Sequence, residues 1–181
     1  MRLPTSFFER DVLEVAPDLL GKYIARQHDG AVTLHRIVET EAYRGEEDLA
    51  CHASKGRTPR TEVMYGRGGR VYVYLIYGMH HLLNFVTSGE GNPQAALIRG
   101  VEGALGPGRV GKLLRLDKSF YAEDLLTSTR IWVVDNCEPA PQIATGKRVG
   151  VDYAGAWKNK PWRFIALPLN EADRGRSGDK I

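Results

Sequence analysis

The sequence predicts an α+β fold: a single domain over residues 1–181, built around a curved, largely antiparallel β-sheet with flanking short helices. Segments rich in Val, Ile and Tyr, which favour strands, are separated by short turn signals. The helical patterns are short and do not alternate regularly with the strands, which argues against a parallel α/β sheet. A chain of 181 residues is long enough to bury one core without cross-links.

The N-terminal part predicts two helices and a hairpin. Over residues 7–23 apolar side chains recur at helical spacing, and Pro17 is expected to separate two short helices. The β-like segments 22–27 and 31–43 follow, joined at residues 28–30, whose His-Asp-Gly sequence is a hairpin signal.

The middle of the chain predicts a loop and three more strands. Residues 45–56 are polar and loop-like. Residues 71–88 are the most β-like stretch, and Gly78 breaks this stretch where two strands could meet. The turn residues "GEGNP" then precede a strand over 94–103.

The C-terminal part predicts two helices and two strands. Residues 109–116 have the pattern of a basic amphipathic helix, and "FYAEDLLTS", residues 120–128, indicates another short helix. Strands are expected at 130–136 and at 161–167, where "PWRFIAL" would be the last strand of the sheet.

Composition and charge narrow the class of protein. No apolar run approaches the length of a membrane span, and the first residues lack the long apolar stretch of a signal peptide. Cys51 and Cys137 form no ligand motif and need not pair, which indicates a reducing, intracellular environment. The formal net charge is only +3, but basic residues gather in regions 57–70, 109–118 and 147–180. Such patches suit a polyanion such as DNA, although an ordinary soluble surface explains them at least as well.

Residues 38–43, "VETEAY", predict a strand with two different faces. Because side chains alternate along a strand, Glu39, Glu41 and Tyr43 share one face, while apolar and small residues occupy the other. A carboxylate beside a tyrosine could act as a general base that removes a proton from an attacking water. It could equally be a salt-bridge partner, so the residues alone leave both interpretations of Glu41 open.

The segment 71–77 carries three tyrosines. Alternation places Tyr72 and Tyr74 on one face, where they could stack on a flat ligand or be buried in the sheet, and burial is expected of Tyr72. Tyr77 stands at the end of the strand, immediately before Gly78. A large ring at a turn is poorly placed for a core and well placed to push into a partner.

The remaining candidate site residues are histidines and isolated polar residues. His52, His80 and His81 do not stand at a zinc-like spacing with a third ligand, so no metal site is expected, and a stacking role for His52 is favoured. Asn84 and Arg99 are single polar residues in apolar strands. Taken alone, each is more typical of a hydrogen-bonded sheet residue than of a specificity element.

Together these motifs resemble a known family. The segments, in chain order, are "ETEAY", "YVYLIYGMH", "ALIRGVEG", "GPGRVGKLLRLDKSFYAEDL" and "RVGVDYAGAWKNKPWRF". They resemble the alkyladenine (3-methyladenine) DNA glycosylase family, and the similarity runs through nearly the whole chain. The resemblance implies a monofunctional base-excision-repair enzyme with no cofactor, a monomer that acts on double-stranded DNA inside the cell. It would flip damaged purines out of the duplex, 3-methyladenine first, with hypoxanthine and ethenoadenine as further candidates.

The resemblance also implies roles for the candidate residues. Glu41 would activate the water that hydrolyses the N-glycosidic bond, leaving an abasic site. Tyr43, His52 and Tyr74 would line the pocket and stack on the extruded base. Tyr77 would fill the gap left in the duplex, because apolar wedges can replace lost stacking.

The resemblance also implies roles for Asn84 and Arg99, and two other functions are considered beside it. By the same resemblance, Asn84 would crowd the exocyclic amine of guanine, and Arg99 would lie in the pocket beside the water. The alternatives are a non-catalytic nucleic-acid-binding domain and a small-molecule hydrolase with a tyrosine-lined pocket. Glu41 argues against the binding domain, since an acid beside a DNA groove repels phosphate, and the basic patches are unexplained by the hydrolase.

Overall fold

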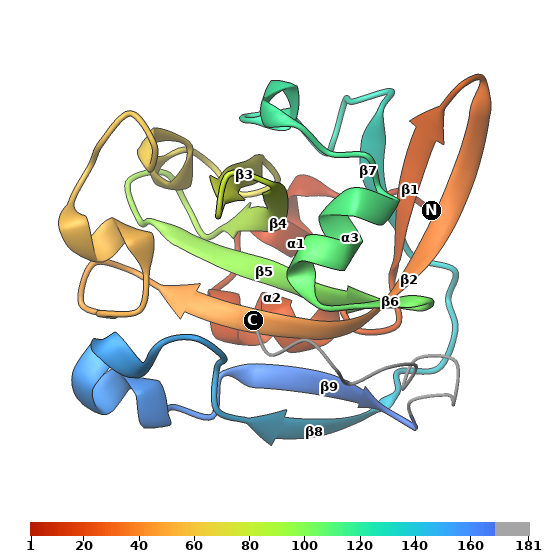
Figure 1. Cartoon of the computed structure of the whole chain (residues 1–181). Coiled ribbons are helices and arrows are strands. Elements are labelled where there is room, and N and C mark those ends of the chain that lie inside the picture. The colour runs from red at the N-terminus through yellow and green to blue at the C-terminus, as the bar shows by residue number, and fades with distance from the viewer. Residues whose placement is uncertain (169–181) are drawn as a thin grey trace.

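The computed structural model describes residues 1–168, which form one curled antiparallel sheet with short helices against it (Figure 1). The strands are β1 (Tyr23–His28), β2 (Ala31–Arg44), β3 (Val71–Ile76), β4 (His80–Thr87), β5 (Gln94–Val101), β6 (Ala104–Leu105), β7 (Ile131–Val134), β8 (Gln142–Gly146) and β9 (Arg163–Leu167). Their order is β3-β4-β5-β2-β1-β7, with β6 beside β5 and the β8–β9 pair joined to β2 through β9. All pairs are antiparallel, so the predicted α+β fold with a curved antiparallel sheet is confirmed.

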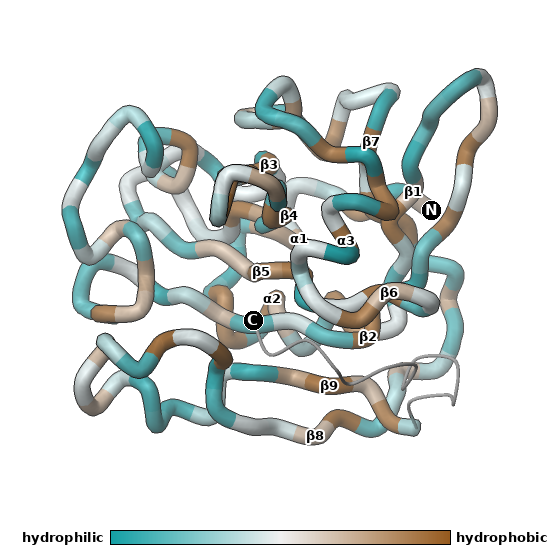
Figure 2. Tube along the Cα trace, viewed as in Figure 1, coloured by the Kyte–Doolittle hydropathy of each residue, from teal (hydrophilic) through white to brown (hydrophobic). Residues whose placement is uncertain are grey.

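The helices are short, as predicted. The α-helices are α1 (Thr5–Phe8), α2 (Val12–Asp18) and α3 (Pro107–Leu113), and the 3₁₀ turns are η1 (His52–Lys55), η2 (Glu62–Tyr65), η3 (Lys118–Phe120) and η4 (Asp152–Asn159). Hydrophobic residues lie mainly in the middle of the fold, and the outer loops are largely hydrophilic (Figure 2). No helix within residues 1–168 is both long and apolar enough to cross a membrane.

β2 is the strand around which the sheet is organised. Its first half pairs with β1 through the turn at Asp29 and Gly30, both at positive φ, which confirms the predicted hairpin. Its second half lies between β5 and β9. The register with β5 shifts between Ile37 and Thr40, and this bulge places Ile37 and Val38 both in the core. Because a bulge bends a strand, β2 can leave β1 and pair with β9 further along.

After the bulge, β2 separates two environments. Thr40 and Ala42 face the core, where the Thr40 hydroxyl donates a hydrogen bond to the Ala16 carbonyl of α2 at 2.8 Å. Glu39 and Glu41 lie on the opposite face, away from α2, where both contact basic side chains. The two faces predicted for this strand are therefore present.

A glycine lets α3 pack closely on the sheet. A Cβ atom at Gly111 would lie 1.9 Å from the carbonyl oxygen of His81 in β4, so a larger residue would collide with backbone. One turn earlier, a Cβ at Gly108 would lie 3.0 Å from Cγ of His80. The close approach of Gly111 to the His81 backbone and of Gly108 to the His80 ring sets the position of α3 on the sheet.

The break between the first two helices differs from the prediction. Pro17 lies inside α2 rather than between two helices. The break falls instead before Val12, where the Asp11 side chain accepts a hydrogen bond from the Leu13 N–H at 2.9 Å and caps α2. The capping residue, not the proline, therefore decides where the helix begins.

The helix predicted over 120–128 is wrong beyond the η3 turn. The Ala122 N–H donates to the Val71 carbonyl at 2.9 Å, and the Val71 N–H donates to the Glu123 carbonyl at 2.8 Å. The segment thus satisfies backbone groups on the outer edge of β3. Such long-range pairing outweighs a weak local helix preference.

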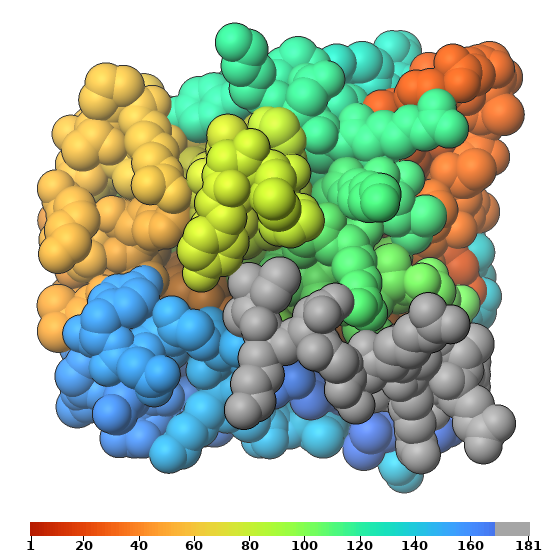
Figure 3. Space-filling model, in the orientation of Figure 1, coloured from red at the N-terminus to blue at the C-terminus, as the bar shows by residue number. Residues whose placement is uncertain are grey.

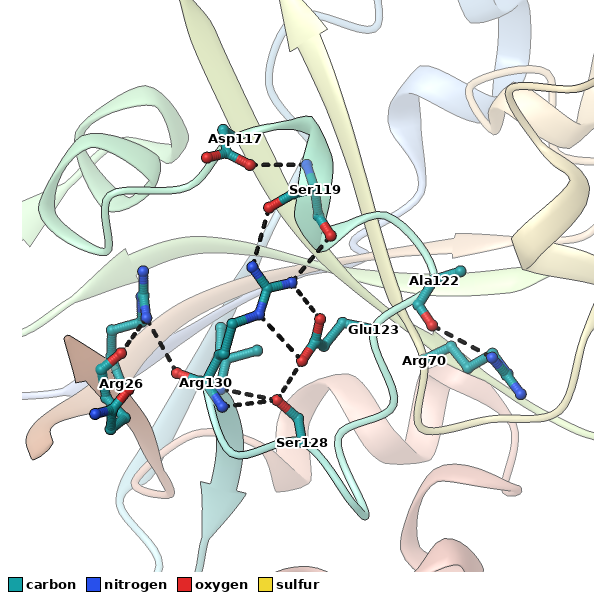
Figure 4. A network of polar contacts seen from close by, with 10 residues as sticks. Arg26, Arg70, Asp117, Ser119, Ala122, Glu123, Ser128 and Arg130 are labelled. Atoms are coloured by element: carbon teal, nitrogen blue, oxygen red, sulfur yellow. Dashed lines mark hydrogen bonds and ion pairs between the residues drawn. The ribbon is translucent and has the colours of Figure 1, made fainter.

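A polar network anchors this covering segment (Figure 4). The Arg130 guanidinium donates to the hydroxyl and the carbonyl of Ser119 at 3.0 Å each and forms an ion pair with Glu123. The Ser128 hydroxyl donates to the same carboxylate at 2.5 Å. These contacts hold the segment against the sheet where regular secondary structure is lacking.

Candidate active site

A cavity of about 1140 Å³ opens on the face of the sheet that carries Glu39 and Tyr43. Its walls come from β2 to β5, from the loop containing η1, from the first turn of α3 and from residues 149–153. Six of the seven predicted site residues line it: Tyr43, His52, Tyr74, Tyr77, Asn84 and Arg99. In the space-filling view the tip of the β3–β4 hairpin stands out between the loop around residues 45–65 and α3 (Figure 3).

Three aromatic rings form one wall of the cavity. Tyr72 and Tyr74 alternate onto the same face of β3, with ring centroids 5.3 Å apart. The ring of His52, in η1, packs edge-on against Tyr74 at 4.7 Å, and its Nδ1 shares a hydrogen bond with the Tyr72 hydroxyl at 2.7 Å. Tyr72 is buried, as predicted, whereas Tyr74 and His52 keep exposed surface. The wall offers a flat base a surface for stacking.

This aromatic wall is uncharged near pH 7. Burial, with a smaller contribution from the Arg60 cation, lowers the pKa of His52 to about 4. Burial raises the pKa of Tyr72 to about 12 and raises the pKa of Tyr74 as well. The imidazole and both phenols are therefore neutral, so none of these rings repels a cationic ligand.

Glu41 lies directly behind the cavity wall and has no exposed surface. Its Oε2 accepts a hydrogen bond from the Tyr43 hydroxyl at 2.7 Å, and its Oε1 accepts one from the Val149 N–H at 2.7 Å. Nε of Arg99 lies 3.5 Å from the same Oε1. Burial raises the pKa of the Glu41 carboxyl above its usual range, opposed by the Arg99 charge and by the hydrogen bonds from Tyr43 and Val149. Such a carboxylate beside a cavity has the properties of a general base.

Glu39 holds Arg99 beside Glu41. Nε of Arg99 donates to Oε1 of Glu39 at 3.0 Å, and Nε of Arg163 in β9 donates to the same oxygen at 2.5 Å. Two guanidinium groups thus contact the same oxygen of the Glu39 carboxylate. Glu39 and Glu41 therefore share the Arg99 guanidinium.

Tyr77 lies at the tip of the β3–β4 hairpin with 71% of its surface exposed. Its backbone φ is 52°, and the φ of Gly78 is 68°. Left-handed backbone is rare for a bulky residue, whereas glycine adopts it freely. Met79 on the same tip is also largely exposed. The tip therefore presents large side chains to solvent on a strained backbone.

Asn84 lies in the floor of the cavity. It pairs with Tyr72 across β4 and β3, and its side-chain amide donates to the Tyr72 carbonyl at 3.1 Å. The sheet therefore fixes its orientation. Asn84 is both a hydrogen-bonded sheet residue and a cavity residue, so it fits both interpretations that the sequence left open.

Sequence reasoning missed several residues of this site. The guanidinium of Arg60 lies over the Tyr74 ring at 4.9 Å, and in the sequence it is only one member of a basic cluster. Val149 and Tyr153 line the cavity from the segment "RVGVDYAGAWKNKPWRF", which contributed to the resemblance but to which no site role was assigned. No local pattern in the sequence indicates that this segment meets β2.

The basic clusters only partly face the cavity. Four of their members line it: Arg60, Arg109, Lys112 and Arg163. Four others form ion pairs elsewhere: Arg57 with Glu62, Arg67 with Asp124, Arg115 with Asp29 and Arg148 with Asp48. The remaining basic residues near the C-terminus, Arg174, Arg176 and Lys180, lie outside the described residues.

Side chains of types that can bind metals line the cavity, among them His52, His80 and Cys51. Within residues 1–168, no three His, Cys, Asp or Glu side chains gather where they could hold a metal ion. Cys51 and Cys137 are not joined by a disulfide, and burial raises the pKa of the Cys51 thiol to about 12. A thiol with so high a pKa is a poor nucleophile.

Comparisons with known proteins add independent information. The model of the methylpurine-DNA glycosylase family matches residues 6–168. Similar proteins carry the name "Putative 3-methyladenine DNA glycosylase". One from Myxococcus xanthus is 46% identical over 182 residues, covering 96% of this chain and 94% of that protein. Relatives from Desulfitobacterium hafniense and Legionella pneumophila are 44% and 45% identical, each over 90% of this chain and over 94% and 93% of their own lengths.

Proposed function

Because this chain belongs to the methylpurine-DNA glycosylase family, DNA repair enzymes that hydrolyse N-glycosyl bonds, we propose that it flips damaged purines out of duplex DNA into the cavity and excises them there. It is a 3-methyladenine DNA glycosylase of base excision repair. The proposal concerns its substrates and its mechanism. The substrate is 3-methyladenine, with hypoxanthine and ethenoadenine as further candidates, and the product is an abasic site.

Glu41 is the proposed general base. Its carboxylate contacts Tyr43, Arg99 and Val149, which all line the cavity. The 3.5 Å separation from Arg99 is the loosest of these contacts, so we place the attacking water there, between two groups that must move apart to admit it. A water in that position would be held by a carboxylate and a guanidinium together. Hydrogen bonds of a free active site commonly rearrange when substrate binds.

The proposed reaction consumes one water molecule and uses Glu41 as the general base. The water oxygen bonds to C1′, and the C1′–N9 bond breaks with its electron pair leaving on the purine. Glu41 accepts a proton from the water, and its negative charge stabilises the positive character of the sugar in the transition state. An alkylated, cationic purine leaves as a neutral molecule. A neutral purine needs an additional proton on a ring nitrogen as it leaves.

The neutral aromatic wall supports the choice of substrate. Stacking on an aromatic side chain is worth about 1–3 kcal/mol per base and tolerates many base shapes. An arginine lies over one face of Tyr43 and of Tyr74, and the opposite face of each ring would attract a cationic alkylated base more than a normal one. We assign Asn84 to the exclusion of guanine, because its fixed amide in the cavity floor would crowd an exocyclic amine.

Tyr77 is the proposed wedge. Extruding a base leaves a gap whose lost stacking costs a few kcal/mol, least where damage has weakened pairing. An exposed ring on the hairpin tip beside the cavity can fill that gap. Arg60, Arg109, Lys112 and Arg163 supply positive charge on the same side for the DNA backbone.

The single observation that carries this proposal is the Glu41 carboxylate behind a tyrosine-walled cavity. Glu41→Gln removes the base and keeps the shape, so excision should fall by about a hundredfold or more. The measurement uses duplexes containing hypoxanthine or methylated adenine, followed by alkali to cut abasic sites. Binding of the same duplexes should survive.

The matched control is Glu102→Gln, which removes an exposed carboxylate paired with Arg36. This variant should excise like the wild type. Strand breaks that persist in Glu41→Gln would remove Glu41 from its role. A wild type that binds lesion duplexes tightly and never cuts the bond would instead favour the alternative, a non-catalytic nucleic-acid-binding domain. We also propose that the enzyme acts as a monomer on DNA inside the cell, and light scattering of the purified protein should report one chain per particle.

A further inference from the structure

We propose that Arg148, clamped by Asp48, is a positioning residue for the catalytic carboxylate. One ion pair buried behind the cavity would hold in place both donors that bind Glu41, the Tyr43 hydroxyl and the Val149 N–H. This inference rests on the proposed function of Glu41. It concerns two residues that do not line the cavity and that touch no substrate.

The Arg148–Asp48 pair is completely buried. The guanidinium makes two parallel contacts to the Asp48 carboxylate, at 2.5 and 2.8 Å, and both side chains have no exposed surface. The same guanidinium also donates to the Ala42 carbonyl at 2.9 Å and to the Trp157 carbonyl at 3.2 Å. It therefore ties three separate chain segments to one point.

One of these ties and two further features of Arg148 lead to Glu41. Ala42 stands between Glu41 and Tyr43 in β2, so the hydrogen bond to its carbonyl fixes the backbone between the base and its phenol partner. The Arg148 guanidinium also lies over the Tyr43 ring at 4.9 Å. Val149 is the next residue after Arg148, so the clamp sets where its N–H points.

Asp48 is itself held in position. It accepts hydrogen bonds from the N–H groups of Arg44 at 3.0 Å and Ala50 at 3.1 Å. The pair is thus well supplied with partners, although Nε of Arg148 has none within residues 1–168. A buried ion pair is weak evidence for stability, since apolar residues of similar size often serve as well. A role in fixing geometry explains why so costly a pair lies here.

The Glu41 carboxylate faces several charged or titratable groups. They are Tyr43 and Glu39 on β2, Arg99 on β5, Tyr74 on β3, Arg163 on β9 beyond Glu39, and Arg148 behind Tyr43. Hydrogen bonds to an ionised carboxylate favour the ionised form. Loosening the two donors should therefore raise the pKa of Glu41 and move the acid limb of the rate profile to higher pH.

The test is the double variant Asp48→Asn with Arg148→Met, which removes both charges at once and leaves neither one unpaired. The rate of 3-methyladenine release from methylated DNA is measured under single-turnover conditions from pH 5 to pH 9. This cationic base needs no proton to leave, so the acid limb reports the general base. We expect the limb to move up by about one pH unit, which is a tenfold loss on the acid side. Rates at high pH and DNA affinity should change little.

The control is the polar network of Figure 4, which offers a second Arg–carboxylate pair over an aromatic ring. Glu123→Gln with Arg130→Met should lower the melting temperature and leave the pH profile in place. Should the Asp48/Arg148 double variant fail to fold, Arg148→Lys keeps the charge but loses the planar fork, and it should shift the limb in the same direction.

The outcomes distinguish a failure of the positioning inference from a failure of the proposed function. An unshifted profile in a folded variant, while Glu41→Gln is inactive, overturns the positioning inference alone. Full activity of Glu41→Gln overturns the proposed function instead, together with any role for its positioning. A shifted limb with unchanged DNA affinity supports both.

Discussion

Glu39 and Glu41 lie two positions apart on one face of β2, yet their neighbours differ. Two guanidinium groups donate to Glu39, whereas Glu41 receives one phenol, one backbone N–H and a loose contact with Arg99. Burial raises the pKa of the Glu41 carboxyl. The negative charge of Glu39 is balanced by the two guanidinium groups. The surroundings also decide the charge of the His52 imidazole, because burial and the nearby Arg60 cation lower its pKa.

Arg60 offers a test of this environment at the level of one residue. Arg60→Gln removes the cation beside His52, so the pKa of His52 should rise from about 4. The pKa should stay below its usual value of 6.5, because burial is the larger cause of its depression. NMR titration of the imidazole measures the change. Arg57→Gln, on an exposed arginine paired with Glu62, should leave the His52 titration where it is. An unmoved titration in Arg60→Gln would show that Arg60 does not act on His52.

At the level of elements, hairpins and bulges decide what each strand presents. The bulge in β2 turns its second half toward β9, and the tip of the β3–β4 hairpin carries Tyr77 out of the sheet on a left-handed backbone. Strained backbone at a functional position is expected when the side chain is needed there. Within residues 1–168, β8 pairs with β9 alone, and its residues are half-buried or exposed.

At the hairpin tip we expect Tyr77 to lower thermal stability and to increase excision from duplex DNA. Tyr77→Gly relieves the left-handed backbone and removes the ring, so thermal stability should hold or rise. Excision from duplex DNA should fall by about tenfold, since the lost stacking is worth 1–3 kcal/mol. Excision of the same lesion in single-stranded DNA should fall less, because no gap needs filling.

The matched control for this tip is Asp29→Gly in the β1–β2 turn. Asp29 has a φ of 51° and does not line the cavity, so the change relieves a similar backbone without touching the site. This variant should excise from duplexes like the wild type. An equal loss on duplex and single-stranded substrates in Tyr77→Gly would argue against a wedge.

At the level of the whole molecule, the two faces of the curled sheet have different surroundings. One face packs on α1 and α2 around the main core, and the other carries the cavity with its neighbouring basic residues. A modest net charge is therefore compatible with a locally positive binding face, because the charge is unevenly placed.

This asymmetry predicts a salt-dependent affinity for DNA. Each phosphate contact made by a basic residue releases counterions, so the logarithm of the affinity should fall linearly with the logarithm of salt concentration. Lys112→Gln, at the cavity, should reduce that slope by about one. Arg10→Gln, on the side of α1 and α2 and paired with Asp18, should leave the slope unchanged. Fluorescence anisotropy at several salt concentrations gives both slopes, and equal slopes for Lys112→Gln and the wild type would contradict this binding face.

Two of the errors of sequence reasoning have a common physical origin. The helix expected over 120–128 becomes an edge partner of β3, and β8 forms because β9 offers it an edge. Both outcomes depend on a strand that lies far away along the chain. Local propensity amounts to only a fraction of a kcal/mol per residue, so a distant partner easily overrides it.

By itself, the sequence determined the strands that carry the site and the face that each side chain takes. Alternation along a strand is a local property of the backbone, so Glu41, Tyr43 and Tyr74 could be placed on their faces from the letters alone. Only the tertiary structure decided that Arg148 meets Ala42 across 106 positions of the chain and that Val149 donates to Glu41. Those contacts join segments whose residues carry no periodic signal, because they are set by packing between distant parts of the sheet.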